Sequence, residues 1–465
     1  MEDCQVNNSF SNIEQLTEAV NNMTVASLRE VARDFGIVPR NRKRDELIRM
    51  IIDVYNGDMQ PEGPKKMGRP TKASMARQPA AEPTIAEQTP ALAEVGQGIL
   101  EIMPDGYGFV RTENYSTTPG KDYYVSAGII QRMNLRTGDK LTAVLKQYPD
   151  KTAPSVVFVK EINDQVCLGL RRTPFDMLEA CFPNERINIV ADRTDYSLRA
   201  LDLVAPIGKG TRGLIVAPPK AGKTVLLKKI AKAVSQNHPE IHLTLLLIDE
   251  RPEEVTDFKD SVDCDVGYST FDQSPQNHTR IAEIVMANAR RRVEQGQDVM
   301  ILMDSITRLG RAYNQTIEMS GRTLTGGLDI SALQEPKKMF GSGRNVRGGG
   351  SLTILATALV ETGSKLDDIV FEEFKGTGNM EIRLDRRMSE KRVFPAIDLN
   401  RSGTRREELL FTPEEMEGMM LCRRMLSGED PVRATEELLD IIMATADNKE
   451  TVEILRRLNS RRGKK

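Results

Sequence analysis

The spacing of apolar residues divides the chain into stretches with different periods. Apolar residues recur at helical spacing from Val25 to Phe35 and again from Leu47 to Tyr55. From Ile99 to Val159 the period falls to about two, in short runs separated by turns such as Pro104-Asp105-Gly106. From about residue 200 onward, apolar runs typical of buried strands alternate with helical patterns. The pattern predicts a helical module, a small β-barrel, and an α/β domain with helices on both faces of a parallel sheet.

These patterns, and the composition between them, predict a multidomain chain. The chain has 465 residues, and a single hydrophobic core does not usually support a chain of this length. We expect a helical module over 1–56, a flexible linker over 57–96, an OB-type barrel over 97–165, a connector over 166–199 and an α/β domain over 200–465. The strands expected in the barrel are Ile99–Met103, Gly106–Arg111, Asp122–Val125, Lys140–Leu145 and Ser155–Val159.

The predicted linker is rich in Pro, Ala, Glu, Gln and Thr and almost lacks large apolar residues, so it cannot bury enough surface to order itself. Within it, Lys65 to Lys72 reads KKMGRPTK and resembles an AT-hook for the DNA minor groove. A solubilising basic tract explains the same residues, and either one would support a weak contact with DNA. The basic stretch from Arg40 to Arg44 is likewise open to two interpretations, a phosphate contact and a solvated helix start.

The second predicted strand of the barrel carries candidate RNA-binding residues. In DGYGFVR, the side chains of Tyr107, Phe109 and Arg111 share one face, because residues two apart in a strand point the same way. Rings on such a face stack on bases, while an arginine beside them meets phosphate. Aromatic residues that face one way also form barrel cores, but the stretch is similar to the ribonucleoprotein-type strand of cold-shock domains, which favours stacking. Tyr124 is a third candidate platform.

A phosphate-binding loop follows the first strand of the α/β domain. Residues 213–224 read GLIVAPPKAGKT, which is a strand, a Pro/Gly loop and the start of a helix. In a P-loop, backbone N–H groups cradle the phosphates, the lysine reaches the β- and γ-phosphates, and the hydroxyl ligates Mg²⁺. Ala217 replaces the usual first glycine of the motif. The sequence predicts an ATP and Mg²⁺ site that includes Ala221, Gly222, Lys223, Thr224 and Val225.

Two further buried-strand patterns lead to acidic residues with candidate roles in hydrolysis. Val299–Met303 ends in Asp304, the position at which an aspartate holds Mg²⁺ through water. Leu243–Ile248 leads to Glu250, which would polarise the attacking water at the same sheet edge. The alternatives are helix capping by Asp304 and ordinary ion pairing of Glu250 with Arg251.

Composition narrows the possible partners and the compartment. Charge is nearly balanced, with 65 basic and 67 acidic side chains, so a nucleic-acid contact must come from a local patch. The five cysteines and three histidines show neither metal-ligand spacing nor a disulfide framework. No apolar run approaches the ~18 residues of a membrane span, and the N-terminus lacks a signal-peptide pattern. We expect a soluble, cytoplasmic protein with no membrane contact.

Several segments together carry a close resemblance to one family. They are GLIVAPPKAGKT, LLIDERPEEVTDF, DSITRLGRAYN, LTGGLD, ATALVETGSK, FEEFKGTGNME and EKRVFPAIDLNRSGTRREELL. They resemble the Rho family of bacterial transcription termination factors, which are hexameric RecA-like RNA translocases. The resemblance spans about 98–410, with a looser match in the helical module, and Ala217 is usual in that family. It implies a cold-shock-like OB-type barrel and a RecA-like α/β P-loop ATPase domain, assembled as a homohexameric ring.

The resemblance also implies roles that spacing alone does not single out. Arg405 matches an arginine finger that enters the neighbouring subunit's site, and Arg392 matches a second arginine near the phosphates at that interface. Phe394 matches the ring that stacks on adenine, and Lys220 matches a further P-loop lysine.

Two glycine-containing loops, Met319–Asp329 and Thr362–Lys365, match loops that line the central hole of the ring. Simple surface turns are the alternative explanation for both. A lysine is more usual in the family at Arg322, and one family aromatic has no clear counterpart near 152–155, which leaves base preference open. The residues that the resemblance places on RNA here are Arg322, Thr323, Thr325 and Lys365.

These observations predict an ATP-dependent 5′ to 3′ RNA translocase and RNA–DNA helicase. It would capture nascent single-stranded RNA and release RNA polymerase from the elongation complex. Two alternatives stay open at this point. A catalytic subunit of a rotary ATP synthase shares the nucleotide core but lacks the DGYGF strand, and a non-catalytic RNA-binding regulator would keep only a structural P-loop. Asp304 and Glu250 argue against the second alternative.

Overall fold

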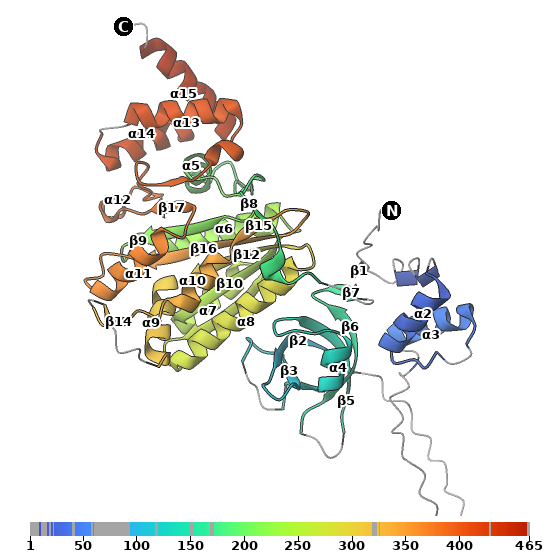
Figure 1. Ribbon diagram of the computed structural model, residues 1–465. Coiled ribbons are helices and arrows are strands. Elements are labelled where there is room, and N and C mark those ends of the chain that lie inside the picture. Colours follow the sequence, from blue (N-terminus) through green and yellow to red (C-terminus); the bar gives the residue numbers. More distant parts are fainter. Residues whose placement is uncertain are drawn as a thin grey trace, which may run out of the picture. The chain divides into compact units, whose positions relative to one another are not determined.

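The computed structural model describes residues 9–10, 16–17, 20–21, 23–39, 42–56, 59, 94–116, 120–148, 152–167, 172–318, 323–324, 326–426 and 429–462. Contacts divide the chain into two compact units, 1–171 and 172–465 (Figure 1). The basic tract Lys65–Lys72 lies outside the described residues, so its contact with DNA stays a prediction. None of the helices that the structure describes is both long and apolar enough to cross a bilayer.

Within the described residues of the N-terminal region, α2 (Val25–Asp34) and α3 (Arg44–Asn56) are the helices given over their full length. α2 begins after Thr24, the predicted N-cap, whose hydroxyl accepts a backbone N–H at 3.3 Å. The apolar faces of both helices form one core, and this core also includes Phe158 and Val166 of the barrel. The helical module therefore packs on the barrel within the first unit and does not stand apart from it.

The barrel closes as predicted for an OB-type fold, because its strand order β1-β7-β6-β4-β3-β2-β5 is completed by a pairing between β5 and β6. Its core is built from residues such as Leu100, Val110 and Val125. The elements are β1 (Ser9–Phe10), β2 (Glu94–Ile102), β3 (Gly108–Arg111), β4 (Tyr123–Val125), α4 (Ala127–Arg132), β5 (Lys140–Lys146), β6 (Ser155–Ile162) and β7 (Gln165–Cys167).

Three strand starts differ from the sequence prediction, and β4 differs by one residue only, since it begins at Tyr123 and not at Asp122. β2 begins at Glu94 and not at Ile99, because residues 94–99 pair in register with β5. β3 begins at Gly108 and not at Gly106, because Gly106 adopts a φ of 85° in the turn and donates its N–H to the carbonyl of Met103. The turn therefore takes two residues from the expected strand.

The second unit is built on a parallel sheet, as predicted for a RecA-like domain. The strand order is β11-β10-β12-β16-β9-β17-β18, parallel as far as β17 and antiparallel at β18. These strands are β9 (Arg212–Ala217), β10 (His242–Glu250), β11 (Asp265–Thr270), β12 (Asp298–Asp304), β16 (Ser351–Leu359), β17 (Met380–Arg383) and β18 (Gly403–Thr404). The short strands β8 (Ala180–Cys181) and β15 (Arg344–Val346) extend it off β16.

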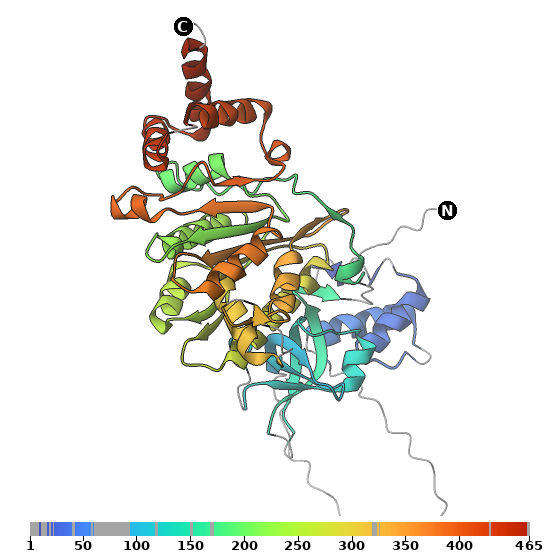
Figure 2. The same ribbon diagram turned by 60° about the vertical axis from the view of Figure 1, so that its left-hand side comes forward.

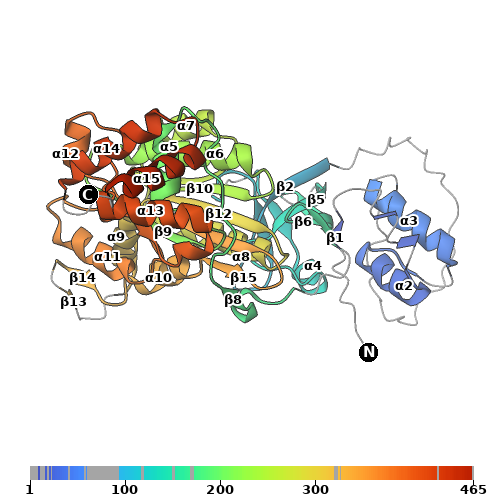
Figure 3. The same ribbon diagram turned by 90° about the horizontal axis from the view of Figure 1, so that it is seen from above.

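Helices cover both faces of this sheet. Seen from above, α6 and α7 lie on one side of β10 and β12, and α8, α10 and α11 lie on the other (Figure 3). The helices are α6 (Lys223–Asn237), α7 (Pro252–Ser261), α8 (Pro275–Val293), α9 (Ile306–Thr316), α10 (Gln334–Gly341) and α11 (Lys365–Lys375). The apolar faces of α6 and α7 pack against strand residues such as Ile215, Leu245 and Leu302.

A helical layer at the C-terminus has its own core. It joins Ala200 and Leu203 to Met419, Leu438 and Leu455. The red helices near the C-terminus belong to this layer (Figure 2). The helices that form this core are α5 (Tyr196–Val204), α13 (Pro413–Leu426), α14 (Pro431–Met443) and α15 (Asn448–Arg462). The short helix α12 (Arg386–Glu390) places Met388 in a separate cluster with Ala396 and Val432, and the 3₁₀ turns are η1 (Phe175–Met177) and η2 (Glu407–Leu409).

The carboxyl ends of the parallel strands form one side of the sheet and their amino ends form the opposite side; these two sides are called its carboxyl edge and its amino edge. The carboxyl ends of β9, β10 and β12 lie at one edge, and the turns after them carry the P-loop and the predicted acidic residues. The amino ends lie at the opposite edge, where β18 pairs with the start of β17. Ligands of open α/β sheets bind beyond the carboxyl ends, so the first edge is the place to look for a nucleotide site.

Candidate nucleotide and RNA sites

The P-loop joins β9 to α6 with the geometry of a phosphate cradle. Gly222 is the N-cap of α6 and adopts a φ of 87°, and Lys220 also lies in the left-handed region with a φ of 65°. Lys223 and Thr224 are the first residues of the helix, where free N–H groups attract anions. Ala217 is the buried last residue of β9 and pairs with β16, so no glycine is needed at that position.

Lys223 and Asp304 meet at the sheet edge. The Nζ atom of Lys223 forms an ion pair with Oδ1 of Asp304, and the hydroxyl of Thr357 donates to the same oxygen at 2.8 Å. Asp304 is fully buried, and its Oδ2 atom has no hydrogen-bond partner among the described residues. Buried acceptors without a partner are rare and call for an explanation. A carboxylate oxygen left open beside the P-loop lysine suits Mg²⁺, which prefers oxygen ligands and water.

Glu250 is the buried last residue of β10. Its Oε2 atom lies 3.5 Å from Nη1 of Arg308, while the side chain of Arg251 is exposed and lies near Glu254. The cation beside Glu250 is therefore Arg308, in the first turn of α9, and not Arg251. Burial raises the pKa of Glu250, the Asp304 carboxylate adds to this, and Arg308 and Lys223 act in the opposite direction. Sequence reasoning missed Arg308, although it lies one helical turn after Asp304.

An apolar cavity of about 250 Å³ lies beside the P-loop. The ring of Phe394 is half exposed, and one of its carbons lies 3.8 Å from where a side chain on Gly222 would begin. Val225 and Leu226 of α6 and Leu384 complete much of the wall. The structure thus brings Phe394 to the P-loop, where a flat aromatic base would fit. Arg392, two residues earlier, is exposed and has a φ of 63°.

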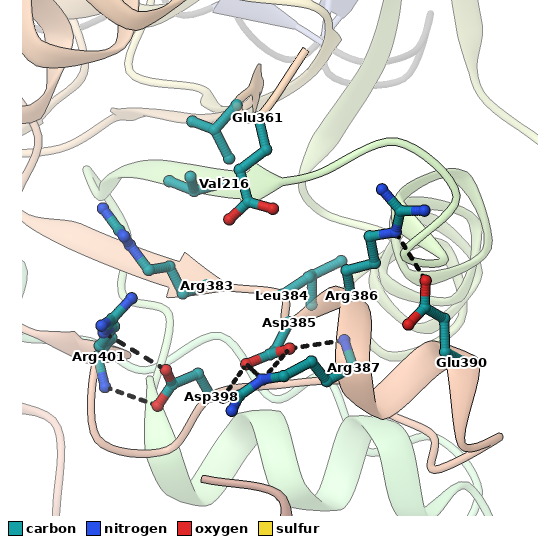
Figure 4. Close-up of a pocket in the computed structure, with 11 residues that line it drawn as sticks. Val216, Glu361, Arg383, Leu384, Asp385, Arg386, Arg387, Glu390, Asp398 and Arg401 are labelled. Carbon is teal, nitrogen blue, oxygen red and sulfur yellow. Dashed lines mark hydrogen bonds and ion pairs between the residues drawn. The ribbon is translucent and has the colours of Figure 1, made fainter. Parts of the chain in front are cut away.

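A second, charged cavity of about 350 Å³ shares Leu384 with the first (Figure 4). Its wall is rich in arginine, but these side chains form ion pairs with acidic residues close by. The pairs are Arg383 with Glu381 at 2.9 Å, Arg386 with Glu390 at 2.8 Å, Arg387 with Asp385 at 2.8 Å and Arg401 with Asp398 at 3.6 Å. Cations held in this way are poor phosphate ligands, so the P-loop and the apolar cavity form the better nucleotide site.

Arg405 lies at the opposite edge of the sheet. It follows β18, is exposed, and donates its backbone N–H to the carbonyl of Asn379 at 2.7 Å. The six residues of β9, at about 3.3 Å each, place roughly 20 Å of strand between this edge and the P-loop. An arginine side chain does not span that distance, so Arg405 does not reach Lys223 of its own chain.

Three rings gather on the outer face of the barrel. Phe109 and Tyr124 are cross-strand neighbours with ring centroids 6.0 Å apart, and Tyr107 lies 5.8 Å from Phe109 and 5.9 Å from Tyr124. All three side chains are partly exposed, while Val110 and Val125 point into the core. The rings form one surface patch and are not core residues.

Arg111 is placed differently from the expectation that it meets phosphate. It is buried, and its guanidinium pairs with Glu101 and with Asp122, both at 2.6 Å. It also lies 5.1 Å from the centroid of the Phe109 ring. A guanidinium held by two carboxylates supports the aromatic patch and is not available to a phosphate group, so a contact with the RNA backbone must come from other residues.

The two loops predicted to line a central hole lie next to each other. A side chain on Gly326 would come within 3.3 Å of Lys365, which is the exposed first residue of α11. The first loop contains β13 (Thr323–Leu324) and β14 (Leu328–Asp329). Arg322 and Thr325 lie outside the described residues, and Thr323 is described only through its backbone.

Fold and site together define a P-loop ATPase unit joined to an OB-type barrel. A model for the nucleotide-binding domain of the ATP synthase alpha/beta family matches residues 197–404, and a model for the RNA-binding domain of Rho termination factor matches residues 96–167. In fold, the chain is similar to an ATPase from the type III secretion system of pathogenic bacteria, with a TM-score of 0.52 and 23% identity, over 67% of this chain and 93% of that one.

Relatives over most of the chain identify the family. The transcription termination factor Rho of Pseudomonas aeruginosa is 51% identical over 370 residues, which cover 78% of this chain and 88% of that protein. The factor of the same name from Aquifex aeolicus is 50% identical over 362 residues, which cover 76% and 83%. The chain belongs to the Rho family of transcription termination factors. The predicted family is confirmed, and the RNA-binding domain explains why the rotary ATPase alternative fails despite the shared nucleotide core.

We expect the substitution Arg111→Leu to destabilise the barrel locally by about 3 kcal/mol, because it leaves two largely buried carboxylates without their cation. Hydrogen exchange of the β3 amides measures this opening free energy. Lys121→Leu is the matched control, since it removes an exposed pair with Glu113 that is worth less than about 1 kcal/mol. Equal, small effects of the two substitutions would contradict the supporting role of Arg111.

Proposed function

We propose that this transcription termination factor is an RNA-dependent ATPase that moves 5′ to 3′ along single-stranded RNA and unwinds RNA–DNA hybrids. One observation carries the proposal. The phosphate-binding lysine and the buried aspartate are in contact at one edge of the sheet, while an exposed arginine stands at the other edge. Neither edge completes a hydrolytic site alone, which favours an assembly in which hydrolysis links neighbouring subunits.

The residues at the carboxyl edge of the sheet would bind and hydrolyse ATP. The Gly222 turn and Lys223 would hold the phosphates of ATP, with the adenine against Phe394 and Val225 in the apolar cavity. Thr224 and Asp304 would hold Mg²⁺, which when bound neutralises charge that develops on the phosphates. Glu250 is the general base for the attacking water.

The amino edge of the sheet would serve the active site of a neighbouring subunit. Arg405 would enter the site of the next subunit in a homohexameric ring and stabilise negative charge in the transition state, with Arg392 as a second cation at that interface. Lys220 adds positive charge at the P-loop. The support for this arrangement is the distance along β9, which separates Arg405 from the P-loop of its own chain.

RNA would be held at two places. The ring patch Tyr107, Phe109 and Tyr124 would stack on bases of the nascent strand, and its position within residues 96–167, which match an RNA-binding domain, supports this role. The loops around Gly326 and Lys365, with Arg322, Thr323 and Thr325, would contact the strand within the ring. Movement of these loops during hydrolysis would pull the strand and release RNA polymerase from the elongation complex.

We expect Lys223→Ala to abolish RNA-stimulated ATP hydrolysis and Arg405→Ala to lower kcat by about 10³-fold or more with nucleotide affinity retained, because the finger acts on the transition state. Steady-state hydrolysis with polycytidylate and equilibrium nucleotide binding measure the two quantities. Arg424→Ala, which removes an exposed arginine of α13, should leave both unchanged. Full activity of Arg405→Ala would refute the proposed interface.

We expect Tyr107→Ala and Phe109→Ala each to weaken capture of single-stranded RNA by about 1–3 kcal/mol, because each removes a stacking surface. Titration of a fluorescent oligonucleotide measures the affinity. Hydrolysis stimulated by short oligonucleotides, which bind the loops, should be spared. Phe109→Tyr keeps a ring and should bind like the parent protein, and a loss of affinity in that variant would argue against stacking.

The raised pKa of Glu250 predicts the pH dependence of hydrolysis. A general base must be ionised, so kcat/KM should fall as the pH falls through a pKa that lies above the ordinary 4.5 of a glutamate. Arg308→Met removes the cation 3.5 Å away and should shift this acidic limb to higher pH, whereas Lys259→Met on α7 should not. Glu250→Gln should lose activity at every pH. An acidic limb that stays in place in Arg308→Met would show that another group titrates.

A further inference from the structure

Asn379 joins three strands at the amino edge of the sheet. It immediately precedes β17, and its Oδ1 atom accepts the N–H of Arg212, the first residue of β9, at 2.7 Å. Its own N–H donates to the Arg212 carbonyl at 2.9 Å, and its carbonyl accepts the N–H of Arg405 at 2.7 Å. One residue therefore bonds both to the start of the P-loop strand and to the backbone of the proposed finger.

Thr404 anchors the same segment from the other side. Its hydroxyl donates to the carbonyl of Pro206 at 2.8 Å, and its backbone pairs with Met380. Arg406, which follows the finger, lies over the ring of Phe182 at 5.0 Å. The residues on both sides of Arg405 are thus fixed. Its own side chain is exposed, and the described part of the chain shows no hydrogen bond or ion pair for it.

The side chain of Arg405 lies near other cations of its own chain. The side chain of Arg212 donates to the carbonyls of Thr377 and Gly343, at 3.0 and 2.7 Å, and not to a carboxylate. Burial lowers the pKa of Arg212, and the positive charges of Arg344 and Arg405 lower it further. A guanidinium that faces other cations on its own chain is stabilised by an anion brought from outside.

We infer that Asn379, with Thr404, is a positioning residue that fixes Arg405 to the amino end of β9. This inference rests on the proposed role of Arg405. The strand that ends in a subunit's own P-loop then also sets the position of the arginine that serves the neighbouring site. Because β9 is a central strand hydrogen-bonded to β16 and β17, it moves as a unit. A displacement of its P-loop end therefore also displaces Arg405.

The test is a pair of double-mutant cycles on the full-length protein, read as kcat for RNA-stimulated hydrolysis and as nucleotide affinity. Asn379→Ala removes the acceptor of the Arg212 N–H and should lower kcat about 10- to 100-fold with nucleotide affinity unchanged, because a shift of about 1 Å in a catalytic group has this effect. In the Arg405→Ala background the same substitution should have no further effect on kcat, because Asn379 acts through Arg405.

Additive losses in kcat, or a fall in nucleotide affinity as large as the fall in kcat, would overturn the inference, because a general structural defect produces these results. Thr404→Val keeps the shape of the side chain and loses only the bond to Pro206. Thr404→Val is combined with Arg405→Ala in the same double-mutant cycle. If Asn379→Ala does not fold, this second cycle tests the inference. Full activity of both variants also overturns the inference. Full activity of Arg405→Ala alone would instead refute the proposed function, so the two failures are distinguishable.

Discussion

The ion pair between Lys223 and Asp304 is the contact on which the ATPase unit depends. It connects the first residue of α6 to the last residue of β12. Thr357, on the neighbouring strand β16, donates a hydrogen bond to the same Asp304 oxygen. A fully buried carboxylate is costly, and here only one of its oxygens is satisfied within the described residues. In the proposed site, this cost has a function, because the open oxygen is the one that would hold Mg²⁺. A site that was satisfied without its cofactor would bind that cofactor less well.

Much of this edge could be predicted from sequence because parallel strands align their carboxyl ends. Each buried-strand pattern locates one end, so Lys223, Asp304 and Glu250 were expected to lie together before any register was known. The pattern could not predict Arg308 as the partner of Glu250, since that depends on how α9 turns over the edge. It likewise did not show that Phe394 faces Gly222, and only the family resemblance singled that ring out.

The barrel shows the same limit of prediction from sequence. Alternation along β3 predicts which side chains share a face, and this was right for Tyr107, Phe109 and Arg111. It does not predict what that face meets. Glu101 on β2 and Asp122 just before β4 each pair with the Arg111 guanidinium at 2.6 Å. The result is an aromatic surface with no net positive charge of its own, suited to hold bases by stacking while other groups supply attraction for the backbone.

The length of β9 has a consequence for assembly. In the proposed mechanism its two ends carry complementary halves of one hydrolytic site, about 20 Å apart, and a hydrogen-bonded central strand does not fold back to join them. Only a second copy can bring the amino edge of one sheet to the carboxyl edge of another. Such an interface is head-to-tail, and it repeats until it closes as a ring or continues as a filament. A closed ring is the arrangement in which every Lys223 has an Arg405 from a neighbour, and it is also the one that encloses a path for a single strand of RNA.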